Sequence, residues 1–246
     1  MVVRDLLTRG LLAGLLAGVL ALGVAEVLGE PQVNRAIAVE TRIDRQLGLP
    51  PAPTEVSRDV QSTVGLGTGV LIVGTAFGGL FALAFAFAYG RIGRYGVRAT
   101  AVLVAAAGFC AVYLVPFLKY PPNPPSVGQA STIDQRTELY FGMVLISVVA
   151  MTGAVILGRR LTDRLGAWNA TLVAVASLAA VAAVAFVALP GINEVPAQFP
   201  ATLLWRFRLA SLATQVTLWT TIGLVFGALV ERSPDHRRRV ALQAFR

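Results

Sequence analysis

The chain has 246 residues, a formal net charge of +8 and a mean hydropathy of +0.70, and only 14% of its residues are charged. Soluble domains carry about 25% charged residues, so the composition excludes an ordinary water-soluble protein. The basic excess does not point to nucleic acid as a partner, because the Arg residues stand in short clusters between apolar runs, where they act as topology signals.

Six apolar runs are each long enough to cross a hydrocarbon core of about 30 Å as a helix. They predict an all-α, polytopic membrane helix bundle with six transmembrane helices, forming a single transmembrane domain over residues 1–246. The predicted spans lie at about residues 10–28, 64–89, 99–118, 139–157, 168–189 and 209–230.

The first run carries a glycine stripe. Gly10, Gly14 and Gly18 recur every four residues and share one helix face, which predicts close packing against another helix. The small residues Gly23 and Ala25 leave a cleavable signal peptide as an alternative. We favour a retained span, because the glycine periodicity suits a packed helix.

A short amphipathic helix is predicted outside the membrane at about residues 31–47. Pro31 suits the first turn of a helix, and Gly48 followed by Pro50 forms a stop signal. The helix is expected either to lie along the outer membrane surface or cap the bundle, or to be an ordinary solvated loop helix. The sequence leaves both open.

Short Arg-bearing links set the orientation, because basic residues near span ends stay in the cytoplasm. They precede the first span, join spans two to three and four to five, and follow the sixth. The protein is therefore expected in the cytoplasmic membrane of a bacterium, with both termini inside and long, weakly acidic connections outside. The link residues are Arg4, Arg9, Arg91, Arg94, Arg98, Arg159, Arg160, Arg164, Arg232, Arg237, Arg238, Arg239 and Arg246.

The outer connections hint at an internal repeat. Each outward span ends in a turn with Pro and Asn, and each returning span begins beside an Arg, namely Arg58, Arg136 or Arg208. This pattern predicts three repeated helical hairpins, as in transporters with parallel repeats. Low-complexity Ala and Gly sequence can mimic such a repeat, so the alternative stays open.

Ionisable and polar residues gather near the outer ends of the spans, where they are candidates for a polar vestibule. Interfacial snorkelling and surface ion pairs are the alternative reading. No catalytic constellation is present, and the lone His236 lies in the Arg-rich tail, so neither an enzyme nor a resident cofactor is expected. The vestibule candidates are Lys119, Tyr120, Asn123, Asn193, Arg206 and Arg208, together with Glu26, Glu138 and Glu194.

Three stretches carry a family resemblance: residues 9–18 leading to Gly29-Glu30-Pro31, residues 120–125 followed by 135–137, and residues 195–197 followed by 208–214 and Trp219. Together they resemble the CbtA family of predicted cobalt transporter subunits. The resemblance implies a multi-span subunit that transports Co²⁺ with a small, His-rich, one-span partner. Family members are often His-rich in the first external connection, whereas residues 30–63 contain no His.

Within a transport subunit, Glu26, Glu138 and Glu194 are the candidates for transient carboxylate contacts with a divalent cation, because the outer side is weakly acidic. A non-transporting membrane scaffold or assembly protein is the alternative function.

Overall fold

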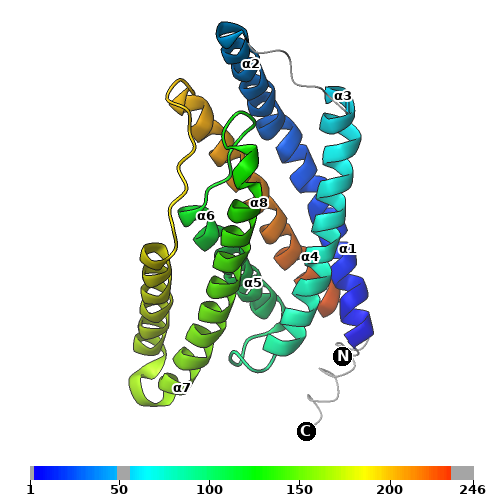
Figure 1. Cartoon of the computed structure of the whole chain (residues 1–246). Coiled ribbons are helices and arrows are strands. Elements are labelled where there is room, and N and C mark those ends of the chain that lie inside the picture. The colour runs from blue at the N-terminus through cyan, green and yellow to red at the C-terminus, as the bar shows by residue number, and fades with distance from the viewer. Residues whose placement is uncertain (1–2, 49–55, 234–246) are drawn as a thin grey trace.

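The computed structural model describes residues 3–48 and 56–233. The predicted all-helical fold is confirmed for these residues (Figure 1). Pro50, His236 and the Arg-rich tail lie outside the described residues. In chain order, the α-helices are α1 (Val3–Val24), α2 (Glu30–Leu47), α3 (Arg58–Val60), α4 (Leu66–Ala88), α5 (Val97–Gly108), α6 (Val115–Lys119), α7 (Ile133–Ala188) and α8 (Ala201–Glu231); η1 (Ala25–Gly29), η2 (Gln61–Gly65) and η3 (Phe109–Leu114) are π-helical turns, and η4 (Ala130–Thr132) is a 3₁₀ turn.

Among the described residues, five helical stretches are long and apolar enough to cross a membrane, as expected of a multi-pass membrane protein. Each predicted span lies inside one of them to within one residue. They are Val3–Leu47, Arg58–Ala88, Val97–Lys119, Ala130–Ala188 and Ala201–Glu231.

Helix α7 contains two of the predicted spans, because it is broken at Gly166. This residue has φ 74° and ψ 160°, a left-handed φ that glycine adopts without steric cost. Figure 1 shows the chain turning back there, so that the two limbs of α7 run side by side. We call these two limbs the α7 hairpin.

The helix predicted at residues 31–47 is confirmed as α2, with Pro31 in its first turn, but it is not separate from the first span. The helix is continuous from α1 through η1 into α2, and the Glu30 N–H donates to the carbonyl of Ala25, five residues earlier. The wider π turn accommodates Pro31, which has no N–H and would crowd the carbonyl four residues before it. The predicted stop is confirmed, because Gly48 ends α2 in the left-handed conformation with φ 66°.

Helix α2 prolongs α1 and packs against the start of α8 and the connection before α7. Ala36 is fully buried and packs in a small apolar cluster with Val127, Phe199 and Leu203. The Ser126 hydroxyl donates to the Ala36 carbonyl at 3.1 Å. Ala36 is the one buried residue of α2, and the capping role of this helix stays a prediction.

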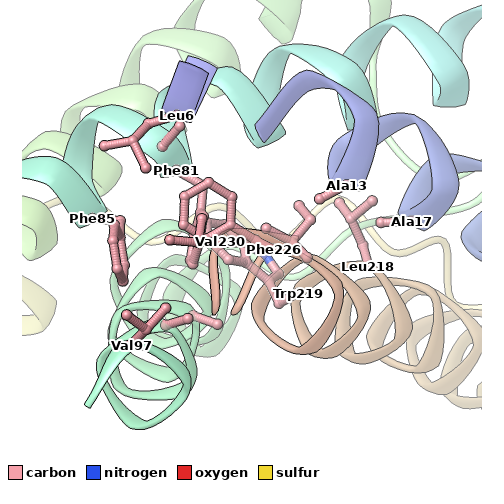
Figure 2. Close-up of a cluster of buried hydrophobic side chains, with 14 of the residues drawn as sticks. Leu6, Ala13, Ala17, Phe81, Phe85, Val97, Leu218, Trp219, Phe226 and Val230 are labelled. Carbon is pink, nitrogen blue, oxygen red and sulfur yellow. The ribbon is translucent and has the colours of Figure 1, made fainter. Parts of the chain in front are cut away.

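The main core is formed by α1, α4, α5 and α8 (Figure 2). Phe226 lies edge-on to Phe81 and Phe85, with ring centroids 5.1 Å and 4.9 Å apart. Such aromatic pairs contribute about 0.5–1.5 kcal/mol beyond the area that they bury. We call α1, α4, α5 and α8 the four-helix body.

The glycine stripe of α1 lies against α4. A Cβ added at Gly14 would lie 2.8 Å from the Gly78 Cα, and one added at Gly74 would lie 2.9 Å from the Gly18 Cα. These distances leave no room for a side chain, so the two backbones touch directly, as small residues allow in membrane helices.

Candidate functional site

The end of α6 is tied to the end of the α7 hairpin. The Lys119 ammonium group donates to the Phe186 carbonyl at 2.7 Å, and the Tyr120 hydroxyl donates to the Pro190 carbonyl at 2.8 Å. Phe186 needs this donor, because the residue four positions later is Pro190, which has no N–H. Two vestibule candidates therefore hold backbone carbonyls at the ends of the spans that lie away from the start of α1 and the end of α8.

Arg208 of α8 binds the connection that precedes α7. Its Nη2 donates to Asn123 Oδ1 at 2.9 Å, and its Nε donates to the Pro122 carbonyl at 3.4 Å. Both Arg208 and Asn123 are half-buried. This contact joins the third predicted hairpin to the turn of the second.

Arg136, near the start of α7, contacts the connection between α7 and α8. Its Nε lies 3.7 Å from Glu194 Oε2, and Glu194 also accepts the Gln129 N–H at 2.8 Å. Hydrogen bonds with Thr132 and with the Gln129 N–H, helped by the charge of Arg136, hold the pKa of Glu194 below its usual value. The Glu194 carboxylate is therefore ionised and already engaged.

A third arginine contact involves Glu30, which the sequence-based candidates did not include. Arg58 forms an ion pair with Glu30, and its Nε donates to Asn34 Oδ1 at 3.1 Å. Glu30 and Asn34 are four residues apart on one helical face, which is the spacing that presents two acceptors to one partner. This spacing opposite an Arg is the signal that could have revealed the pair.

The remaining candidates are not drawn into these contacts. Glu26, Glu138, Asn193 and Arg206 are exposed, and their side chains make no hydrogen bond or ion pair with another described residue. The described part of the chain also contains no group of three or more His, Cys, Asp or Glu side chains that could hold a metal ion. Within the described part of the chain, Glu26 and Glu138 are therefore exposed carboxylates without a side-chain partner.

Two further polar contacts within the third span meet at the π turn η3. Ser147 of α7 donates to the carbonyl of Ala111, and the hydroxyls of Tyr113 and Ser211 lie 2.8 Å apart. The Ala111 carbonyl is available because the Val115 N–H bonds to Cys110 and the next residue, Pro116, has no N–H. Sequence reasoning missed Ser147, although a proline inside a span predicts such a carbonyl.

A family model described as "Probable cobalt transporter subunit (CbtA)" matches residues 3–231, nearly the whole chain. Neither a curated protein nor a solved structure matches the chain. The family match confirms the resemblance carried by the glycine stripe and the Pro-rich connections.

Proposed function

Because the chain belongs to the CbtA family of probable cobalt transporter subunits, we propose that it is the subunit through which Co²⁺ crosses the cytoplasmic membrane of a bacterium. The family match over residues 3–231 is the observation that carries this proposal. The long apolar helices support it, since they supply a membrane-spanning body and leave little room for a soluble domain.

We propose six crossings, with the limbs of the α7 hairpin as the fourth and fifth. The break at Gly166 supports this count, because it reverses the chain between two apolar segments (Figure 1). The start of α1 and the end of α8 share the main core through Leu6 and Val230. Both ends of the described helices therefore lie on one side, which the Arg-bearing links favour as the cytoplasm.

Initial capture of the cation is assigned to a partner. Borderline divalent metals favour imidazole and thiolate ligands, and residues 30–63 contain no His. A small, one-span, His-rich partner subunit would supply these ligands. Glu26 and Glu138 then serve as transient contacts during passage, because their carboxylates are exposed. Glu194 is a weaker candidate, since Arg136 and Gln129 occupy it.

The test is cobalt accumulation under metal limitation in cells that contain the chain, the partner, both or neither. The proposal expects accumulation above background only with the chain present, and more of it with both subunits. Equal accumulation in all four strains would overturn it. A stable complex of the two subunits without any metal-dependent phenotype would instead support the scaffold function.

A further inference from the structure

We call residues 150–182, around the turn at Gly166, the inner half of the α7 hairpin, and the remainder of α7 its outer half. The hairpin is attached to the rest of the molecule by this outer half. Among the described residues, its substantial packing against other elements is with η3, α6 and η4. In an apolar stretch of 18 residues within the hairpin, only 11% of the residues are buried, against 28% to 39% in the corresponding stretches of the other four long helices. The hairpin therefore stands at the side of the four-helix body rather than inside it (Figure 1).

The hydrogen bonds between the hairpin and its neighbours also lie in its outer half. The Ser147 hydroxyl donates to the Ala111 carbonyl in η3. The carbonyls of Phe186 and Pro190 accept hydrogen bonds from Lys119 and Tyr120, respectively. Within described residues 150–182, every recorded side-chain hydrogen bond stays inside α7. Among the described residues, no side-chain hydrogen bond or ion pair joins the inner half of the hairpin to another element.

The hairpin nevertheless coheres as a unit. Its two limbs pack closely near the turn, where a Cβ added at Gly158 would lie 3.1 Å from the Ala174 Cβ. Ala154 and Ala170 are buried in this region. Close packing of small residues gives a pair of membrane helices a rigid contact, so the limbs are expected to move together.

The four-helix body is held at its inner end, in contrast. Arg98 at the start of α5 forms an ion pair of 2.6 Å with Glu231 at the end of α8. Val97 and Val230 are buried in the main core beside this pair (Figure 2). The inner ends of α5 and α8 are thus fixed to each other, whereas no ion pair or side-chain hydrogen bond among the described residues fixes the inner end of the hairpin to either.

We propose that the α7 hairpin pivots as a unit on its outer attachments, so that its inner half swings relative to the four-helix body. The outer contacts form the pivot, and the unbonded inner half provides the freedom of movement. Rocking of one rigid bundle against another is a common basis of alternating access. A role of the movement in releasing Co²⁺ to the cytoplasm rests on the proposed function, whereas the movement itself does not.

The experiment measures distance distributions between pairs of spin labels in the full chain in lipid nanodiscs, without metal. Labels are placed on introduced cysteines, with Cys110→Ser as the background. The inner pair is Arg94→Cys with Arg160→Cys, joining the body to the hairpin. The body control is Arg94→Cys with Arg232→Cys, and the outer pair is Asp134→Cys with Arg206→Cys; all five sites are exposed.

The inner pair should give a broad or two-component distribution, while the body control and the outer pair give narrow ones. An inner pair as narrow as the body control would overturn the proposal. Lys119→Met combined with Tyr120→Phe should broaden the outer pair without changing the body control, because it removes two of the pivot bonds. A narrow outer pair in that variant would show that these residues are not the pivot, and would also count against the proposal.

These outcomes are separate from those of the transport test. Distances are measured on purified protein without cobalt, so a mobile inner pair in a chain that transports nothing would overturn the transport function and leave the pivot standing. A rigid inner pair in a chain that accumulates cobalt would do the reverse.

Discussion

Lys119 completes the α7 hairpin by donating to the carbonyl of Phe186, at a distance of 2.7 Å. The contact exists because Pro190 cannot supply the N–H that a continuing helix would provide. The proline after one span leaves a backbone carbonyl without its helical donor, and a lysine at the end of another span supplies the hydrogen bond.

Lys119→Met is expected to lower the free energy of unfolding by about 1–3 kcal/mol, the cost of leaving a desolvated acceptor without a partner. The measurement is the unfolding transition in detergent micelles. Lys119→Arg is the matched control, because it retains a donor on a long side chain, and it should restore at least part of the loss. Equal stability of the Met and Arg variants would contradict the assignment.

The glycine stripe gives a sharper packing prediction. Gly14→Leu should destabilise the fold by at least the roughly 1–3 kcal/mol typical of overpacking, because the neighbouring atoms belong to the backbone of α4 and cannot move aside singly. Gly23→Leu lies in the same helix with no atom within 4 Å of an added Cβ, so it should be tolerated. The readout is the melting temperature and the fraction of monodisperse protein after extraction.

The π turn η3 predicts unequal effects of removing two hydroxyls. Ser147→Ala should cost about 1–3 kcal/mol if the Ala111 carbonyl is left without a donor. Tyr113→Phe should cost less, near the average of about 0.6 kcal/mol for hydrogen bonds between membrane helices, because the Ser211 hydroxyl can turn to the carbonyl four residues earlier in α8. Unfolding measurements on both variants decide the order, and a larger loss for Tyr113→Phe would refute this account of η3.

Much of the fold is predictable from the sequence because lipid imposes simple length and polarity rules. The predicted spans on either side of Gly166 fall within the two limbs of α7, although the helix is otherwise continuous. Pro31 misleads because a proline after a long apolar run usually marks a helix start, whereas the π turn η1 carries the helix through it. The difference lies in backbone geometry that residue preferences do not encode.

The candidate site is harder to predict, because its contacts cross between hairpins. The sequence shows that Arg58, Arg136 and Arg208 each stand at the entrance to a returning span, but not which turn each one reaches. Arg58 stays within its own hairpin, whereas Arg208 binds the turn before α7. That choice depends on how the hairpins pack, which one sequence without long-range pairing information does not specify.

Acid should weaken the outer connection around Glu194. Its pKa is depressed in the folded protein, so its stabilising contribution is complete above the unfolded value of about 4.3 and is lost as the pH falls through the lower folded value. Exchange of the Gln129 amide hydrogen, which Glu194 accepts, should therefore accelerate over that acid range beyond the intrinsic pH effect. In Glu194→Gln this extra pH dependence should vanish; its persistence would assign the acid response to another group.

The open carboxylates give the prediction that bears most directly on function. Glu26 and Glu138 are exposed and have no recorded partner within the described residues, so their replacement by Gln removes charge without breaking a contact. If each contributes about 1.4 kcal/mol to cation passage, Glu26→Gln or Glu138→Gln should reduce the rate of cobalt accumulation about tenfold at unchanged protein level. Glu40→Gln is the matched control, since Glu40 is an exposed carboxylate of α2 outside the candidate group. Unchanged accumulation in both variants would remove these carboxylates from the path and leave cation selection to the partner.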